Sequence, residues 1–404
     1  MQGDRQGAGM PRAMIYVQHL LGIGHLMRAR RLAEAMAVDG FAVHLVSGGM
    51  PIGGRLPNGV QTVQLPPIRV SDASFTPLRD GEFVPIDDAY RLRRRDLLLD
   101  AYERARPDVL LFETFPFGRR SLRFELFPLL ERVEATRPRP LVVASIREIL
   151  QLQQKRERER EMLGWAARWF DAILVHGDPR FARFEETFSF TDELTPPVHY
   201  TGFVLDLDLG SDPASAKAGS DPAFRDEVVV SAGGGGVGVE LLATALAAQP
   251  LSRLAHLTWR VLAGPNIRPD GMERLARACG PNAIVERSRV DFAALLRRAR
   301  VSISQGGYNT TMDVMTSGAA PVVVPFTGNG ETEQRARGER LAKFGLAVVV
   351  DDRTLTPRSL AAAVDHAATR TFAPWPFESD GTHRTATLLR ELLAARADGE
   401  RSAA

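Results

Sequence analysis

Segments of strand length alternate with amphipathic helical segments along almost all of this 404-residue chain. Such alternation predicts parallel sheets with helices on both faces. The strand-like segments of the first half are 14–18, 42–47, 109–112, 141–145, 172–175 and 198–201, with helical patterns at 26–38, 122–134 and 149–169. Those of the second half are 227–231, 258–263, 283–285, 301–304, 320–325 and 347–350, before a last helical pattern at 383–395. We therefore expect an α/β protein with one sheet in each half.

A stretch rich in Asp, Ser, Ala, Gly and Pro at 205–226 separates the two halves and has the composition of a linker. A chain of this length also exceeds what one ordinary core organises. We expect a disordered N-terminus at 1–13, a Rossmann-like domain at 14–204 and a second one at 227–374. Residues 375–404 are expected to form a C-terminal helix that packs back on the first domain.

Composition restricts the class of protein. The net charge of +2 gives no field of the kind that indicates nucleic-acid binding. The single cysteine, Cys279, excludes an internal disulfide. The N-terminal residues lack the apolar segment of a signal peptide, and no apolar run of about 18 residues occurs. We expect a cytoplasmic enzyme without a transmembrane segment.

The most informative motif is the turn that follows the strand-like segment 301–304. Gly306 and Gly307 let backbone N–H groups approach an anion at a helix start, and the side chains of Asn309 and Thr310 add donors. Asp313 lies two turns further on, where a carboxylate can accept bonds from ribose hydroxyls. The motif predicts a nucleoside-diphosphate site built without lysine or metal. The alternative is a glycine-capped helix start in a packed domain.

The turn after the first strand contains Gly22, Gly24 and His25 ahead of an amphipathic helix. It lies beyond the carboxyl end of a strand, where open α/β sheets bind ligands. A helix N-terminus lowers the pKa of an imidazole and favours the neutral form that a general base needs. We predict that His25 is a catalytic base. The alternative is a histidine that only caps its helix.

A second glycine-rich turn, 231–238, follows the first strand of the second half. Gly233, Gly235 and Gly238 match the spacing of a dinucleotide fingerprint, but the next strand ends without the required acidic residue. This argues against a dehydrogenase. The turn, including Gly234, suits a phosphate or close domain packing better.

Further polar residues follow the ends of predicted strands. Glu333 and Gln334 lie at a helix start after the strand at 320–325, where they can bond sugar hydroxyls. The alternative there is a capping box made by Thr332. Glu113 and Arg147 end two strands of the first half, on the same sheet edge as His25, and are candidates for binding an acceptor.

No cofactor or metal is expected. Asp206 and Asp208 imitate an Asp-x-Asp metal clamp, but they lie in the linker without a third ligand, and the histidines lack ligand spacing. The arginine cluster at 91–95 beside the leucines at 97–99 allows peripheral contact with an anionic membrane, although a solvated amphipathic helix explains it as well.

Taken together, these residues resemble the GT-B glycosyltransferases related to the lipid-linked N-acetylglucosaminyltransferase of peptidoglycan synthesis. Within that group the chain looks most like a bacterial family of predicted glycosyltransferases with a family 28-like C-terminal domain. The resemblance covers nearly the full length, and 301–345 is its most specific part.

The resemblance implies two Rossmann-like domains facing a cleft, with the nucleotide-sugar donor in the second domain and the acceptor in the first. By position, His25 is the base and Asp313 contacts the ribose, although the family usually has glutamate there. The remaining implied contacts are the diphosphate with Gly233, Gly234, Gly306, Gly307 and Thr310, the nucleobase with the Arg289 backbone, and the donor sugar with Glu333 and Gln334.

We therefore expect an inverting, metal-independent glycosyltransferase that moves a hexosyl or N-acetylhexosaminyl group, with a UDP-sugar as donor. The acceptor is a small molecule, a glycan or a lipid-linked compound. Two alternatives stay open. The Gly22-x-Gly-His25 turn also looks like the N-terminal motif of a UDP-sugar hydrolase, in which the histidine activates water. The chain can also be a non-catalytic sugar-nucleotide-binding subunit, against which an intact His25 argues.

Overall fold

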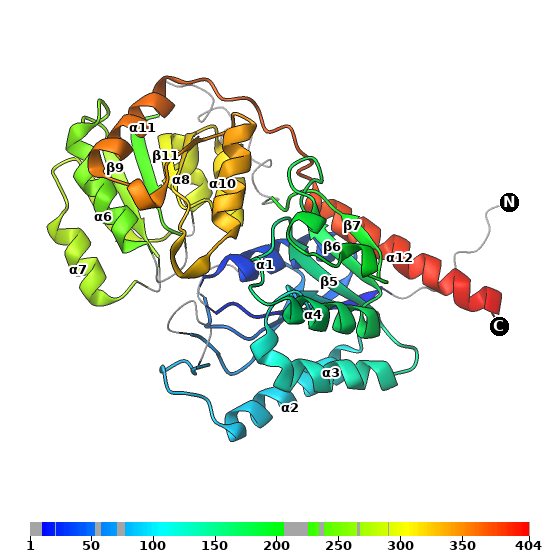
Figure 1. Cartoon of the computed structure of the whole chain (residues 1–404). Helices are drawn as coiled ribbons and strands as arrows, with labels where there is room; N and C mark the ends of the chain where they lie inside the picture. The colour runs from blue at the N-terminus through cyan, green and yellow to red at the C-terminus, as the bar shows by residue number, and fades with distance from the viewer. Residues whose placement is uncertain are drawn as a thin grey trace.

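The computed structural model describes residues 10–20, 22–52, 58–70, 77–205, 225–233, 238–264, 267–289 and 291–403. They form two lobes, each built around a parallel sheet with helices packed against it (Figure 1). The long helix α12 (Gly381–Ala403) ends the chain and lies along the first lobe (Figure 1).

The first lobe contains a seven-stranded parallel sheet in the order β3-β2-β1-β4-β5-β6-β7. Its strands are β1 (Arg12–Val17), β2 (Ala42–Ser47), β3 (Val60–Gln64), β4 (Val109–Glu113), β5 (Leu141–Arg147), β6 (Ala172–His176) and β7 (Val198–Tyr200). The helices of this lobe are α1 (Gly24–Val38), α2 (Asp88–Ala105), α3 (Arg123–Ala135) and α4 (Arg156–Trp169).

The second lobe contains a six-stranded parallel sheet in the order β10-β9-β8-β11-β12-β13. Its strands are β8 (Glu227–Ser231), β9 (Thr258–Ala263), β10 (Ala283–Arg287), β11 (Ala299–Ser304), β12 (Ala320–Val323) and β13 (Val348–Val349). Its helices are α6 (Val239–Ala248), α7 (Pro269–Arg277), α8 (Phe292–Arg298), α9 (Tyr308–Ser317), α10 (Glu333–Lys343) and α11 (Pro357–Thr369).

The central strands are buried on both faces, since successive side chains of a strand point to opposite faces and each face is covered. In β1, Met14 and Tyr16 join one core, while Ile15 and Val17 join a second core on the other face. Ala386, Leu388 and Leu389 of α12 complete this second core against α1. The expected return of the C-terminal helix to the first domain is therefore confirmed.

The order of strands reverses once in each sheet, between β1 and β4 and between β8 and β11. Open α/β sheets bind ligands beyond the carboxyl ends of the strands at such a switch point. His25 follows β1, and Glu113 ends β4. Gly233 follows β8, and Gly306 follows β11. The topology therefore places the candidate residues of each lobe at its switch point.

Several predicted boundaries were wrong. The helix expected at 149–169 begins at Arg156, because Gln151 instead bonds the second lobe through the carbonyl of Gly330 and the backbone of Thr332. The first strand begins at Arg12, within the segment expected to be disordered, and the backbone N–H and side chain of Arg12 bond Asp108. The last helix runs from 381 to 403 rather than from 383 to 395. Asp206, Asp208 and most of the expected linker lie outside the described residues.

Candidate active site

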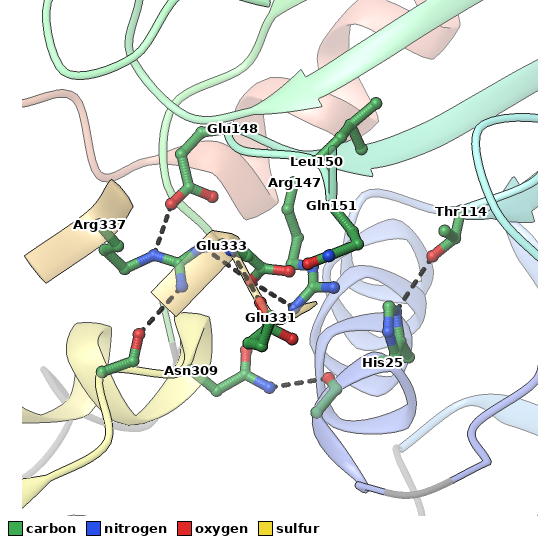
Figure 2. Close-up of polar contacts among 12 residues, drawn as sticks. His25, Thr114, Arg147, Glu148, Leu150, Gln151, Asn309, Glu331, Glu333 and Arg337 are labelled. Carbon is green, nitrogen blue, oxygen red and sulfur yellow. Dashed lines mark hydrogen bonds and ion pairs between the residues drawn. The ribbon is translucent and has the colours of Figure 1, made fainter. Parts of the chain in front are cut away.

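His25 lies beside Glu113 at the switch point of the first sheet. Nδ1 of His25 lies 2.9 Å from Oε1 of Glu113 and 3.1 Å from the hydroxyl of Thr114, the latter contact being drawn in Figure 2. Because a carboxylate only accepts hydrogen bonds, this neighbour favours the proton on Nδ1 and a lone pair on Nε2. That tautomer is the one a general base requires. The capping alternative for His25 is wrong, since α1 has Ile23 at its N-cap position and no side-chain cap.

Glu113 is held by donors on both carboxylate oxygens. Arg28 donates to Oε1, and the hydroxyl of Ser145 donates to Oε2 over 3.1 Å. The same hydroxyl lies 2.7 Å from Nε2 of His176. Burial lowers the pKa of His176 to about 3, so this ring is neutral near pH 7. A buried network therefore fixes the orientation of Glu113 and, through it, of His25.

The backbone that follows β4 is strained where it passes His25. Thr114 has φ +74° and Arg119 has φ +62°. A β-branched residue with positive φ is an outlier, and such strain costs about 1–3 kcal/mol. The hydroxyl of Thr114 also lies 3.2 Å from Oε1 of Glu113. The strained turn thus places a second polar group on the Nδ1 side of His25.

The pKa of His25 is lowered well below the ordinary value of 6.5, with burial as the largest cause. The positive charges of Arg119, Arg147 and Arg28, with His19, lower it further. The sequence correctly predicted the direction of this shift, but burial and neighbouring arginines cause it. At neutral pH the imidazole is uncharged and able to accept a proton.

The switch point of the second sheet presents a glycine turn and the start of α9. Gly306 has φ +74°, and its carbonyl accepts from Nη1 of Arg337 over 2.9 Å. Gly307 is the N-cap residue of α9, and a side chain added there would meet no atom within 4 Å. The first backbone N–H groups of a helix lack intrahelical partners, and they favour an anion. Thr310 lies in the first turn of this helix and is half-buried.

Two residues assigned to the nucleotide reach across to α1. Nδ2 of Asn309 donates to the carbonyl of Gly24 over 2.7 Å, as Figure 2 shows. Oδ1 of Asp313 accepts from Nη2 of Arg31 over 2.9 Å, and both side chains are buried. The glycine turn that precedes α9 in the second lobe therefore lies directly against the His25 turn of the first.

The two residues assigned to the donor sugar take different partners. The carboxylate of Glu333 lies 2.6 Å from Arg147 of the first lobe and 3.0 Å from Arg337 of its own helix (Figure 2). The side-chain oxygen of Gln334 accepts from the backbone of Phe326 over 3.1 Å. The alternative considered there, a capping box made by Thr332, is absent from α10, because that hydroxyl bonds Gln151 and Leu152 instead.

The remaining predicted site residues lie around the two switch points. Gly233 follows β8 with φ +71°, while Gly234 lies outside the described residues. Arg289 follows β10, and its exposed side chain pairs with Asp291. Gly22 lies in the turn before α1, and Gly24 is the first residue of that helix. These positions surround the two switch points, and their ligand contacts stay predictions.

The sequence did not single out several residues that complete the site. They are Arg28, Arg31, Thr114, Ser145, His176, Tyr308 and Arg337. Only Arg28 had a local signal, because it lies three residues after His25 on α1. The others meet through contacts between distant segments, such as the 3.0 Å bond from the Tyr308 hydroxyl to the carbonyl of His176.

Among the residues that the structure describes, no three His, Cys, Asp or Glu side chains converge as a group that could hold a metal ion. None of the described helices combines the length and apolarity that a membrane span requires.

Comparison with known proteins identifies the second lobe. The family model of the glycosyltransferase family 28 C-terminal domain matches residues 229–375. The chain is 24% and 26% identical to the UDP-N-acetylglucosamine--N-acetylmuramyl-(pentapeptide) pyrophosphoryl-undecaprenol N-acetylglucosamine transferases of Thermotoga neapolitana and Paramagnetospirillum magneticum. These matches cover 46% and 45% of this chain and 49% of each relative, so the chain spans about half the length of the curated relatives it matches.

A solved structure extends the likeness to both lobes. The UDP complex of UGT89C1 from Arabidopsis thaliana is 14% identical, with a TM-score of 0.62 over 95% of this chain and 99% of that one. At this identity the likeness shows the fold, which is the GT-B fold. Within that fold, residues 229–375 match the model of the glycosyltransferase family 28 C-terminal domain.

Proposed function

We propose that this protein is an inverting glycosyltransferase that moves a hexosyl or N-acetylhexosaminyl group from a nucleoside-diphosphate sugar to an acceptor hydroxyl. The observation that carries the proposal is the contact between the two switch points, where Asn309 of the phosphate turn bonds the carbonyl of Gly24 beside His25. A donor at one turn and an acceptor at the other would bring the reacting atoms together. The relatives, whose names describe UDP-N-acetylglucosamine as a donor, support UDP as the nucleotide.

In this proposal His25 removes the proton of the acceptor hydroxyl through Nε2. Glu113 stabilises the imidazolium that forms, because its carboxylate faces the Nδ1 proton at 2.9 Å. General base catalysis of this kind contributes about 10²–10⁴-fold. The oxygen that forms attacks the anomeric carbon from the side opposite the diphosphate, which inverts the configuration.

The leaving diphosphate would be stabilised by the start of α9, where donors are already oriented toward developing negative charge. We propose that no metal takes part, because this helix start supplies the electrophilic assistance. Glu333 would bind hydroxyls of the donor sugar, and Arg147, which pairs with it at 2.6 Å, would face the same sugar from the first lobe. Asp313 would bind the ribose.

The test compares His25→Ala with His256→Ala, a histidine on the exposed surface of the second lobe. UDP release from a panel of UDP-sugars is measured with and without acceptors, in buffer containing EDTA. We expect His25→Ala to lower turnover at least a hundredfold with UDP affinity unchanged, and His256→Ala to match the wild type. Since the pKa of His25 lies well below 6.5, the wild-type rate should not fall as pH decreases from 8 to 7.

Each part of the proposal has its own contrary result. Normal turnover in a folded His25→Ala variant would remove the base. UDP release that no acceptor accelerates would identify a hydrolase, in which His25 activates water. Turnover that EDTA abolishes and Mg²⁺ restores would show that a metal takes part.

A further inference from the structure

Arg119 lies at the acceptor side of the site with no carboxylate partner. It follows β4 by six residues, and its Nε donates to the carbonyl of Gln18, just beyond the end of β1, over 2.8 Å. Among the described residues no acidic group forms an ion pair with it. The carboxylate that acts on Arg119 electrostatically, Glu113, is already bonded by Arg28 and Ser145.

Two of the charges that act on Arg119 have the same sign as its own. Burial, together with the positive charge of Arg147, lowers the pKa of Arg119 to about 10, and Arg28 adds to the shift. The backbone of Arg119 is also strained, with φ +62°. A cation that is held in a strained loop beside two other cations is costly unless an anion is bound there for part of the reaction cycle.

His19 is a buried polar group without a hydrogen-bond partner at this place. Its side chain is 5% exposed, neither ring nitrogen forms a hydrogen bond, and the ring lies against Gly49. Burial and the charge of Arg119 lower the pKa of His19 to about 4. The backbone of Met50 opposes this shift but lies outside hydrogen-bonding geometry. Buried polar groups are nearly always bonded, so this neutral imidazole indicates a missing ligand atom.

The donor does not account for these two residues. The donor turn lies at the start of α9, and the arginine of the first lobe that faces the donor loop is Arg147, through Glu333. Arg119 is instead fixed to the end of β1, beside His19 and His25. Arg119 and His19 therefore both belong to the acceptor side.

Building on the proposed function, we propose that the acceptor carries a negatively charged group, a carboxylate or a phosphate, close to the hydroxyl that is glycosylated. Arg119 binds this group with charge-assisted hydrogen bonds, and His19 contributes one further bond. Arg119, Arg147 and Arg28 face His25, as do His19 and Glu113. The bound anion offsets the positive charges of the three arginines. The base therefore becomes stronger when the correct acceptor is present.

The test measures anion binding to protein saturated with UDP, so that the donor phosphate site is already filled. Phenyl phosphate and benzoate are titrated by calorimetry, with benzyl alcohol as the neutral control. We expect one of the two anions to bind wild-type protein at least tenfold more tightly than benzyl alcohol, and which of them does so distinguishes phosphate from carboxylate. Arg119→Gln should weaken that binding at least tenfold, and Arg119→Lys should retain part of it.

Arg120→Gln is the matched control, because the neighbouring arginine pairs with Glu161 and should bind the anion as the wild type does. UDP affinity, measured in the same samples, should be equal in all variants. If Arg119→Gln does not fold, Arg119→Lys and His19→Gln replace it, and both should bind the anion more weakly than the wild type does.

Equal anion binding in Arg119→Gln and wild type would overturn the inference, as would the absence of anion binding to the UDP complex. A second assay compares 4-hydroxybenzoate with 4-hydroxybenzamide as acceptors. A preference for the neutral 4-hydroxybenzamide that Arg119→Gln does not change would also contradict the inference. These results are distinct from failure of the proposed function, in which UDP does not bind or no acceptor receives sugar.

Discussion

At the scale of single residues, the site depends on charged groups that are buried in pairs. Asp313 is an example, since its carboxylate is buried and accepts from Arg31 of the other lobe over 2.9 Å. A ribose that bonds Asp313 would share this carboxylate with the arginine. The position would thereby connect nucleotide binding to the contact between the lobes.

Replacing Asp313 with alanine should weaken UDP binding by about 1–3 kcal/mol, the cost of leaving charge-assisted bonds unmade. Calorimetry with UDP measures the effect. Asp270→Ala is the control, because Asp270 is exposed at the start of α7, and it should bind UDP normally. Unchanged UDP affinity in a folded Asp313→Ala protein would show that the ribose lies elsewhere.

At the scale of elements, the start of α9 separates two uses of glycine. Gly306 needs its positive φ, and a side chain on it would lie 2.8 Å from Val323. Gly307 has φ −63°, which any residue adopts, and has open space where a side chain would project. The first glycine therefore serves the fold, and we propose that the second serves the approach of a ligand.

Gly306→Ala should consequently affect stability, and Gly307→Val should affect UDP binding. Gly306→Ala should lower the free energy of unfolding by about 1–2 kcal/mol or more, because alanine is unfavourable in the left-handed region. Gly307→Val should leave thermal stability nearly unchanged but weaken UDP binding at least tenfold by filling the space for the diphosphate. Denaturant unfolding and calorimetry on both variants measure these effects, and tight UDP binding by Gly307→Val would place the diphosphate elsewhere.

At the scale of the whole molecule, the lobes share a buried apolar cluster that includes Leu32 and Ile149 of the first lobe and Tyr308 and Met312 of the second. Arg337, which is fully buried, crosses this interface. Its Nε donates to Oε1 of Glu148 over 2.7 Å, and the other carboxylate oxygen of Glu148 has no partner (Figure 2). The contact between the two lobes therefore includes a buried ion pair.

Arg337→Ala should lower the free energy of unfolding by about 3–5 kcal/mol, because it leaves Glu148 charged and buried without a counterion. Replacing both partners, as Arg337→Met with Glu148→Leu, should recover most of that loss. Arg335→Ala on the same helix should change stability by less than about 1 kcal/mol, since its pair with Glu339 is exposed. These values come from denaturant unfolding, and a double variant as unstable as the single one would contradict the argument.

The sequence by itself determined the two parallel sheets and the turns that carry the site. Alternating strand and helix patterns require that arrangement, and the glycine turns before His25 and Asn309 are local signals that follow individual strands. Strand ends also made Glu113 and Arg147 candidates, because the carboxyl ends of parallel strands meet at one edge of a sheet.

Only the tertiary structure decided which of these groups meet. The pair of His25 with Glu113 joins residues 88 positions apart, and the bond from Asn309 to Gly24 joins residues 285 positions apart. No local pattern encodes such contacts, which follow from strand order and from the packing of one lobe on the other. The same reason explains why the helix expected from residue 149 begins at Arg156. Gln151 and Leu152, which were expected in this helix, bond the second lobe instead. Those contacts outweigh the local preference for a helix.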